Sequence, residues 1–326
     1  MKRGPAGGCA DRGGPRSEAS TMQLSELRKE LRFYSELVQL IETLKNIAAA
    51  QYHLMEKEKE RFDRFMDAFA GFFRVADLLE VQDPLVKVVS DVLGVVVVTS
   101  DSGFMGGLNQ GVIRKALHQA EAHGRDKVAF TVIGDKGSAI FSDFDIPFKF
   151  FKGIAQDTVY EQSLAVKDHI VSEVLARRMG KVVVVYPKPV SFSAQTIEVI
   201  NILPCGELFD KNAESEVSRR LTGSGILAEA RKVIVESSFS DMVEYLAGVW
   251  VTSKLFEVCE DSKLAEYSAR AMHLEGSVQK VEKERKKFQH KCFKASHEKI
   301  DKGMRESFSA RGKQRRKQSG VAAAAA

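Results

Sequence analysis

The chain has 326 residues and a formal net charge of +5, and 44% of its residues are hydrophobic and 29% charged. This composition predicts a folded chain with a buried core, and its length favours about two domains over one. No run of about 18 consecutive apolar residues occurs, so the sequence predicts no membrane-spanning helix.

The four cysteines are scattered along the chain without the CxxC spacing of a zinc site. Their low density also argues against a disulfide framework. Cys205, Cys259 and Cys292 are expected to be reduced thiols, buried as small hydrophobic side chains.

Residues 1–21 are rich in Gly, Pro and Arg and lack the apolar segment of a signal peptide. A segment of this composition buries too little apolar surface to fold. We therefore expect a disordered N-terminal extension over residues 1–21.

From Leu24 to Phe73 an apolar residue recurs every seven positions, in two interleaved series. Thirteen of the fifteen positions are apolar, and the two exceptions are lysines: Leu24, Leu31, Val38, Lys45, Tyr52, Lys59, Met66 and Phe73, and Leu27, Tyr34, Ile41, Ala48, Met55, Phe62 and Phe69. A seam of this length is stable only when another helix packs along it. We expect a coiled-coil segment over residues 22–82, with Thr21 or Ser25 as the helix N-cap and a helix end near Gly71.

The sequence changes character after Asp83 and Pro84. The run Gly94–Thr99 is β-branched without alternation, which is typical of a strand covered on both faces. The segments that follow read as a Gly-rich loop over 100–107, a helix over about 108–123, a strand over 127–133, a helix over 158–178, a strand over 181–186, an edge or antiparallel strand over 195–203, a long loop over 205–230 and a last strand over 232–236. This alternation predicts an α/β domain with a largely parallel sheet over residues 83–236.

Residues 237–310 have a helical pattern again. Two series with a period of seven, Leu274, Val281, Phe288 and Ala295 and then Val278, Arg285 and Cys292, continue into a stripe of Phe293, Ile300, Met304 and Phe308. This helix is the expected partner of the first one. The predicted fold is a long antiparallel coiled coil of N- and C-terminal helices plus a Rossmann-like α/β domain, followed by a disordered basic and Ala-rich tail over 311–326.

Positive charge is concentrated near the C-terminus. Residues 280–317 contain fifteen Lys or Arg and five Asp or Glu, so this segment carries about +10 and the rest of the chain is net acidic. Such a concentration indicates an acidic protein surface or a nucleic acid as partner.

Three polar features were considered as chemical sites. The Ser100–Gly107 loop precedes a helix, as phosphate-binding loops do, but it lacks both G-x-G-x-x-G and the G-K-[ST] of a P-loop. Asp135 and Lys136 have no His or acid near them in the sequence, and His290 and His297 read as solvated residues of a basic helix. The sequence therefore predicts no catalytic residue, no cofactor and no metal.

The segment from Val97 to Asn109 resembles the gamma subunit of F-type ATP synthases, in which the motif reads TSDRGLCGGLN. It departs from that motif at Ser102, Phe104 and Met105, and the matching motif residues include Ser100, Asp101, Gly103, Gly106, Gly107 and Asn109. Glu266–Ala271 is similar to the family's E-x-x-A-R-M, and Ile47–Gln51 is similar to its M-V-A-A-A-K. The resemblance extends from Leu24 to Phe308.

The resemblance implies a non-catalytic rotor, with the paired helices as a shaft inside a ring of alpha and beta subunits. The α/β domain would lie against the epsilon subunit and the c-ring, and no small-molecule substrate is implied. Shaft rotation changes nucleotide affinity only through contacts that differ among the beta conformations. The implied location is peripheral, at the cytoplasmic face of the cell membrane.

The resemblance also implies which residues contact the ring: Leu44, Ile47, Lys286, Lys287, Lys291, Ser296, His297, Ile300 and Met304. The lysines would face acidic loops of beta subunits. An R-Q pair of the family falls at Ser296 and His297 and is lost in this chain, which marks it as a divergent member.

Two other functions stay open at this point. A nucleic-acid-binding coiled coil would use the basic 280–317 segment to neutralise phosphates. An α/β enzyme would need an acid, base or nucleophile constellation that the sequence does not offer.

Overall fold

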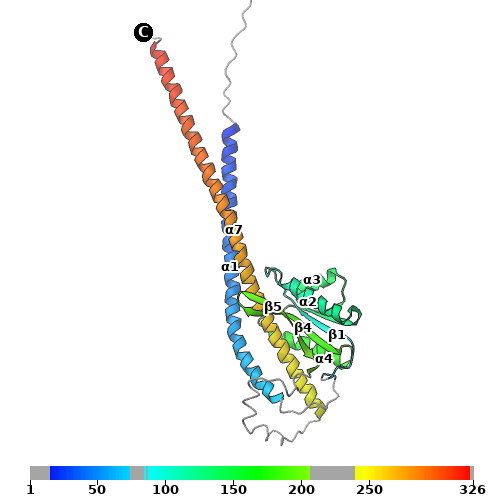
Figure 1. Ribbon diagram of the computed structural model, residues 1–326. Helices are drawn as coiled ribbons and strands as arrows, with labels where there is room; N and C mark the ends of the chain where they lie inside the picture. The colour runs from blue at the N-terminus through cyan, green and yellow to red at the C-terminus, as the bar shows by residue number, and fades with distance from the viewer. Residues whose placement is uncertain (1–14, 74–83, 86, 206–238, 324–326) are drawn as a thin grey trace, which may run out of the picture. The chain divides into compact units, whose positions relative to one another are not determined.

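The computed structural model describes the secondary structure of residues 15–73, 84–85, 87–205 and 239–323. The chain divides into two compact units. The first consists of Met1–Thr43 and Glu275–Ala326, and the second of Leu44–Leu274. Two long helices, α1 (Pro15–Phe73) and α7 (Phe239–Ala323), contribute residues to both units (Figure 1).

The ends of both helices differ from the expected boundaries. Helix α1 begins at Pro15 rather than at residue 22, so Thr21 and Ser25 lie inside it and the predicted N-cap is wrong. Proline is tolerated in the first turn because its missing N–H would have no partner there. Helix α7 continues to Ala323 rather than ending at residue 310, and its last residues are largely Arg, Lys, Gln and Ala, which favour helix.

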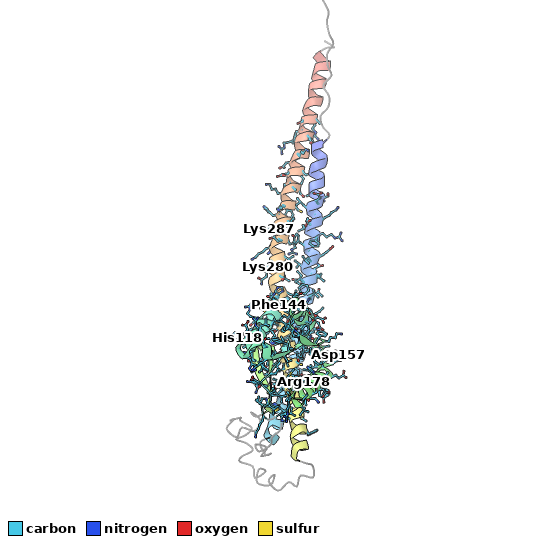
Figure 2. The ribbon with its side chains drawn as sticks, turned by 90° about the vertical axis from the view of Figure 1, so that its right-hand side faces the viewer. His118, Phe144, Asp157, Arg178, Lys280 and Lys287 are labelled. Atoms are coloured by element: carbon cyan, nitrogen blue, oxygen red, sulfur yellow. The ribbon has the colours of Figure 1, made fainter. Side chains whose placement is uncertain are left out.

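In the first unit, α1 and α7 run side by side in opposite directions (Figures 1 and 2). Leu24 and Val38 are buried on α1, as are Val278 and Cys292 on α7. The ring of Tyr34 stacks on that of Phe288 with their centroids 5.0 Å apart. Every member of the two predicted series from Leu24 to Met55, and of those from Leu274 to Ala295, is buried or half-buried. Over these residues the seven-residue period therefore identified the seam correctly, and the side chains of the series from Lys59 to Phe73 lie outside the described ones.

The buried seam does not continue along the α7 stripe. Phe293, Ile300, Met304 and Phe308 are 57, 53, 55 and 71% exposed. Phe293 follows the buried Cys292 directly, and consecutive residues of a helix point about 100° apart. These four side chains consequently lie on a face of α7 turned away from the seam.

The second unit contains a five-stranded sheet in the order β3-β2-β1-β4-β5. Its strands are β1 (Leu93–Val98), β2 (Val128–Ile133), β3 (Phe148–Phe151), β4 (Lys181–Ser191) and β5 (Ala194–Leu203). The first four are mutually parallel, and β5 pairs antiparallel with β4 at one edge. The prediction of a largely parallel sheet with an antiparallel edge strand is confirmed.

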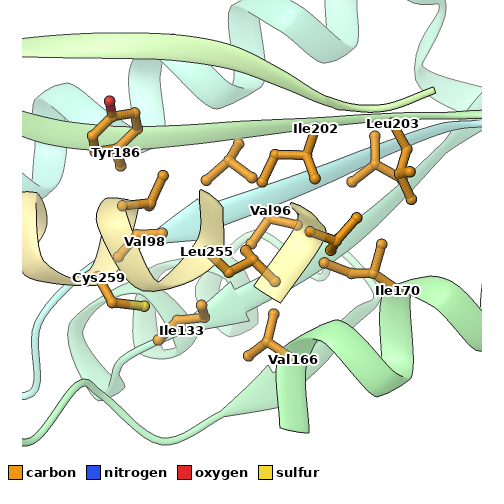
Figure 3. Packing of buried hydrophobic residues seen from close by; sticks show 14 of the residues in the cluster. Val96, Val98, Ile133, Val166, Ile170, Tyr186, Ile202, Leu203, Leu255 and Cys259 are labelled. Atoms are coloured by element: carbon orange, nitrogen blue, oxygen red, sulfur yellow. The ribbon is translucent and has the colours of Figure 1, made fainter. Parts of the chain in front are cut away.

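Helices cover both faces of this sheet: α2 (Leu108–His123), α3 (Asp135–Asp143) and α4 (Val159–Leu175), with a 3₁₀ turn at Arg125–Lys127. Residues of β1 alternate between the two cores. Val95 and Val97 pack with α2 and α3, whereas Val96 and Val98 pack with α4 and α7 (Figure 3). Strand β1 is buried along its whole length for this reason, as its valine run indicated.

The sequence predicted α7 as a helix but not as a layer of the α/β domain. Val251, Leu255 and Val258 of α7 are at most 1% exposed and belong to the same core as β1 and α4. Cys259 lies there too, and burial raises the pKa of its thiol to about 12. One long helix therefore helps to complete the domain core and, further along, forms the coiled-coil pair.

Two other predictions cannot be compared with the structure. The loop over 205–230 and the strand over 232–236 fall almost entirely outside the described residues. Within the described part of the chain, none of the helices combines the length and the apolar character needed to cross a lipid bilayer.

Candidate functional site: the junction of the motif loop and helix α7

The loop of residues 99–107, here called the motif loop, leaves the carboxyl end of β1 and enters α2. Thr99 Oγ donates to the Ile133 carbonyl at 2.7 Å and accepts from the Gly137 N–H at 3.0 Å. Asn109 fastens the other end, because its Nδ2 donates to Ser100 Oγ at 2.9 Å and its Oδ1 accepts from the Ser100 N–H at 3.3 Å. These polar side chains are occupied with holding the loop in place.

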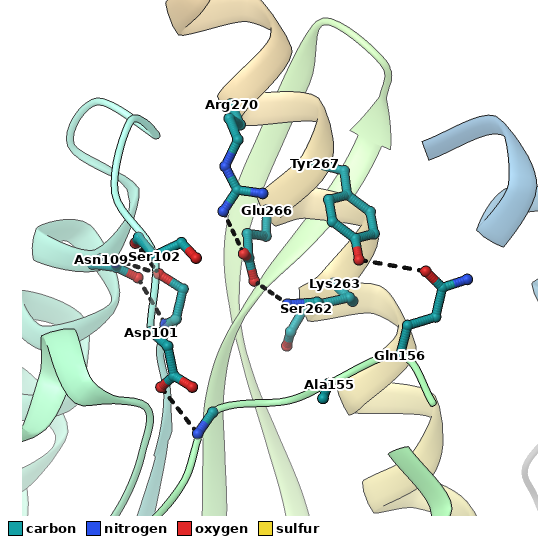
Figure 4. Close-up of polar contacts among 12 residues, drawn as sticks. Asp101, Ser102, Asn109, Ala155, Gln156, Ser262, Lys263, Glu266, Tyr267 and Arg270 are labelled. Atoms are coloured by element: carbon teal, nitrogen blue, oxygen red, sulfur yellow. Dashed lines mark hydrogen bonds and ion pairs between the residues drawn. The ribbon is translucent and has the colours of Figure 1, made fainter. Parts of the chain in front are cut away.

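Asp101 connects the motif loop to the start of α3 and to the loop after β3. Its Oδ1 accepts from the Asp135 N–H at 2.9 Å and from the Gly153 N–H at 3.0 Å, at the carboxyl ends of β2 and β3 (Figure 4). A Cβ on Gly153 would lie 2.3 Å from this oxygen, so the contact requires glycine there. Asp101 therefore links three segments at one edge of the sheet.

Helix α7 meets the motif loop through a charged group that we call the clasp: Lys263, Glu266 and Arg270. Glu266 forms ion pairs with Arg270 Nη2 at 2.5 Å and with Lys263 Nζ at 2.9 Å (Figure 4). Arg270 Nε donates to the carbonyl of Gly103 at 3.4 Å. The three side chains are only 13, 8 and 16% exposed, so the clasp is largely removed from water.

Tyr267 lies beneath the two cations of the clasp. Lys263 Nζ and the Arg270 guanidinium are 5.4 and 6.0 Å from its ring centre, within the range of cation–π attraction. Burial, with the charge of Glu266 as a smaller cause, raises the pKa of the Tyr267 hydroxyl, which stays protonated. The ring belongs to an apolar cluster with Tyr52, Met55 and Leu264, so α1 is packed against this part of α7 as well.

The junction has room for little besides its own side chains. A cavity of about 10 Å³ lies beneath the loop, lined in part by Ser100, Asn109, Ser262 and Glu266. That is about the space for one water molecule, whereas small-molecule sites measure roughly 300–1,000 Å³. Across the described residues, no three His, Cys, Asp or Glu side chains are placed to hold a metal ion. The junction is therefore filled largely by its own side chains.

The structure brings together two segments that the sequence offered separately. The motif loop and the Glu266–Ala271 segment touch through Arg270 and the Gly103 carbonyl, and a Cβ on Gly106 would lie 3.4 Å from His273. Gly106, with a φ of +60°, adopts a left-handed conformation that favours glycine. Sequence reasoning missed Lys263, and it gave no role to Tyr267, which occupies an unspecified position of the E-x-x-A-R-M pattern. The i, i+3 spacing from Lys263 to Glu266 was the available signal.

The residues expected to contact a ring lie on the helices, apart from this junction. Leu44 and Ile47 of α1, in the second unit, are 37 and 51% exposed. The other seven lie on α7 in the first unit and are exposed, except Ser296, which is half-buried: Lys286, Lys287, Lys291, Ser296, His297, Ile300 and Met304. Sequence reasoning did not include Phe293 and Phe308 among the contact residues, although both are large, apolar and exposed.

Local contacts occupy two of the three lysines. Lys287 Nζ pairs with Glu284 at 2.6 Å, and Lys291 Nζ lies 4.8 Å from the centre of the Phe288 ring. Figure 2 shows Lys280 and Lys287 projecting from α7. This part of the helix therefore presents a basic surface beside an apolar stripe.

Paired long terminal helices, with an α/β domain attached to the second of them, place the chain among proteins that combine an antiparallel coiled coil with a Rossmann-like domain. A family model described as ATP synthase matches residues 23–308. The chain belongs to the ATP synthase family, and within it resembles the gamma chains.

Curated relatives carry the name ATP synthase gamma chain. That of Crocosphaera subtropica is 22% identical over 267 residues, covering 76% of this chain and 85% of the relative. The gamma chain of Desulforudis audaxviator is 24% identical over 204 residues, covering 61% of this chain and 67% of the relative. These identities describe a divergent member of the family.

Solved structures share the fold. The rotor of the Euglena gracilis mitochondrial ATP synthase aligns with a TM-score of 0.58 at 15% identity, covering 86% of this chain and 99% of that one. The central stalk and c-ring structure of the Tetrahymena thermophila mitochondrial ATP synthase aligns with a TM-score of 0.55 at 16% identity, covering 73% of this chain and 99% of that one. The antiparallel coiled coil with a Rossmann-like domain is thus the fold of known rotor chains.

Proposed function

We propose that this chain is the central-stalk gamma subunit of an F-type ATP synthase. It would couple ion translocation through the membrane sector to ATP synthesis or hydrolysis in a ring of alpha and beta subunits, by rotation, without being catalytic itself. The observation that carries the proposal is the family match over residues 23–308, which covers most of both long helices and the whole α/β domain between them in sequence.

The geometry suits a part that transmits torque. The seam between α1 and α7 buries apolar side chains along both helices, and each such side chain stabilises the pair by roughly 1.5–3 kcal/mol. The clasp and the shared core attach the α/β domain to α7. A rotor has to remain stiff while its surroundings change, and both attachments favour stiffness.

Ring contact is proposed for the exposed face of α7, together with Leu44 and Ile47 of α1. Ile300 and Met304 supply apolar contact, and Phe293 and Phe308 extend their stripe. Lys286, Lys287 and Lys291 would attract acidic loops across a gap within the Debye length of about 8 Å. Exposed ion pairs contribute only about 0–1 kcal/mol each, and weak contacts of this kind can be exchanged as the shaft turns.

The proposed partners are alpha, beta and epsilon subunits and a c-ring. The structural relatives are a mitochondrial ATP synthase rotor and a central stalk with its c-ring, which supports this set. The chain would be peripheral to the membrane through the complex, at the cytoplasmic face of the cell membrane. The nucleic-acid-binding alternative is not supported by the family match or by the relatives.

Co-purification tests the proposal. A tagged full-length chain should recover alpha and beta subunits from its own cells in a complex with ATPase activity. A variant ending at Ala295 should still recover them but should lose ATP-driven ion pumping, because Ser296–Phe308 belongs to the proposed contact surface. Recovery of the active complex from cells that lack the chain would contradict the proposal.

The basic face of α7 supplies a quantitative prediction. Replacing Lys286 and Lys291 by Glu should slow association with an alpha/beta ring by about tenfold at low ionic strength, because steering by opposite charge acts mainly on the association rate. The deficit should shrink as salt is raised. Stopped-flow mixing at several salt concentrations measures the rate.

The matched control changes two exposed basic residues of α2, Arg114 and Lys115, to Glu. Net charge falls equally in both variants. Equal slowing in both would mean that total charge, rather than the α7 face, governs the association.

A further inference from the structure

Phe104, near the middle of the motif loop, combines two unusual properties. Its side chain is 64% exposed, although phenylalanine is among the residues most often buried. Its φ is +65°, in the left-handed region that bulky residues rarely adopt. An aromatic side chain is thus exposed to solvent at a position whose backbone conformation is unfavourable for a bulky residue.

The loop around Phe104 is held on both sides. Gly103, directly before it, accepts a hydrogen bond from Arg270 of the clasp through its carbonyl, and Asp101 ties the preceding turn to the start of α3 and to the loop after β3. Ser100 and Asn109 fasten the loop to the start of α2. Strained conformations persist where the surroundings over-determine them, and they cluster at functional sites. These hydrogen bonds therefore hold Phe104 in its strained, exposed conformation.

The surroundings of Phe104 suit contact with another protein. Residues 102–109 contain no charged side chain. Gly103 and Gly107 have no atom within 4 Å of a Cβ position, so bare backbone lies open beside the ring. Interface cores are poor in charge and rich in aromatic residues, whereas membrane-surface segments place basic residues beside their aromatics.

We propose that Phe104 is an anchor that inserts into an apolar pocket on another protein subunit, and that Glu266 and Arg270 are positioning residues for it. The inference rests on the proposed function in one respect: the partner is a subunit of that complex. A preorganised loop lowers the ordering cost of binding, which is the advantage that the strained display would provide.

The first experiment separates a contact role from a structural one. Phe104→Ala in the full-length chain should raise the apparent dissociation constant for reconstitution with the other subunits at least tenfold, as loss of an aromatic hot spot does. Its far-UV circular dichroism should stay unchanged. Phe104→Gly should weaken reconstitution equally, yet its unfolding midpoint should be unchanged or a few degrees higher, because glycine relieves the left-handed strain. A lower midpoint for Phe104→Gly, or full reconstitution by either variant, would overturn the proposal.

Phe144 supplies the matched control. It is 65% exposed in the same unit but has an ordinary φ of −97° at the end of α3. Phe144→Ala should reconstitute as the unmodified chain does. If Phe144→Ala reconstitutes as poorly as Phe104→Ala, loss of any exposed aromatic residue weakens assembly, and Phe104 is not a specific anchor. Failure of the unmodified chain to reconstitute would instead count against the proposed function, so the two hypotheses fail differently.

A photo-reactive benzoylphenylalanine at position 104 identifies what the side chain touches. Irradiation of the purified complex should give a cross-link to one protein subunit. Arg270→Lys, which keeps the charge but loses the planar fork, should reduce the yield several-fold without changing the unfolding midpoint by more than a few degrees. Cross-linking only to lipid, or only within the chain, would overturn the proposal.

Discussion

Replacing Glu266 by alanine is expected to lower the free energy of unfolding of the full-length chain by about 3–5 kcal/mol. Glu266 is the shared partner of Lys263 and Arg270, and its removal leaves two cations 13 and 16% exposed without that carboxylate. Removing one member of a buried ion pair costs much more than a surface pair is worth, since the remaining charge stays desolvated. Urea unfolding followed by the fluorescence of Trp250, the single tryptophan, measures the loss.

A second ion pair of the same chemistry provides the control. Glu173 accepts from Arg178 Nε at 2.7 Å and from its Nη2 at 2.6 Å, and this contact lowers the pKa of the Glu173 carboxyl. The Arg178 side chain is 61% exposed, so Glu173→Ala should cost only about 0–1 kcal/mol. Equal losses for the two variants would mean that the clasp is an ordinary surface pair.

Gly134→Ala is expected to cost about 2–6 kcal/mol, for two reasons that act together. Gly134 has a φ of +100°, where an L side chain strains the backbone by about 1–3 kcal/mol. An added Cβ would also lie 2.4 Å from the Thr99 carbonyl oxygen, and overpacking costs about 1–3 kcal/mol. The same urea titration measures the loss at Gly134, the N-cap of α3.

Gly124 separates the two causes. Its φ is +104°, nearly the same, but no atom lies within 4 Å of its Cβ position. Gly124→Ala should therefore carry only the backbone strain, about 1–3 kcal/mol. If Gly134→Ala is no worse than Gly124→Ala, the approach to Thr99 is unimportant and the loop moves to accommodate the methyl group.

Long-range periodicity made the helices predictable, because a seven-residue repeat sustained over fifty residues has few interpretations. The valine run of β1 was equally informative, since only a strand covered on both faces lacks alternation. Helix α3 and strand β3 were missed. The segment Gly134–Gly137 reads as a loop, and Phe148–Phe151 is only four residues long, too short for a period to register.

The sequence indicated which segments make up the candidate site, but not that they contact one another. The motif loop and the Glu266–Ala271 segment were both recognised. Arg270 and Gly103, however, are 167 residues apart in sequence, and nothing local indicates that they touch. The sequence did not show where the seam on α7 ends, for a related reason. Phe293, Ile300, Met304 and Phe308 have helical spacing, but spacing alone does not say which face of a helix finds a partner.

The double membership of α7 restricts how this chain can change in length during evolution. Val251 and Leu255 fill the core of the sheet, and Val278 and Cys292 fill the helical seam, all on one uninterrupted helix. Inserting one residue between these two sets would rotate one set by about 100° relative to the other and displace it by about 1.5 Å. Insertions or deletions between the two sets are tolerable only in lengths that restore the helical phase, such as seven residues. This part of α7 should therefore accumulate substitutions while its length stays fixed.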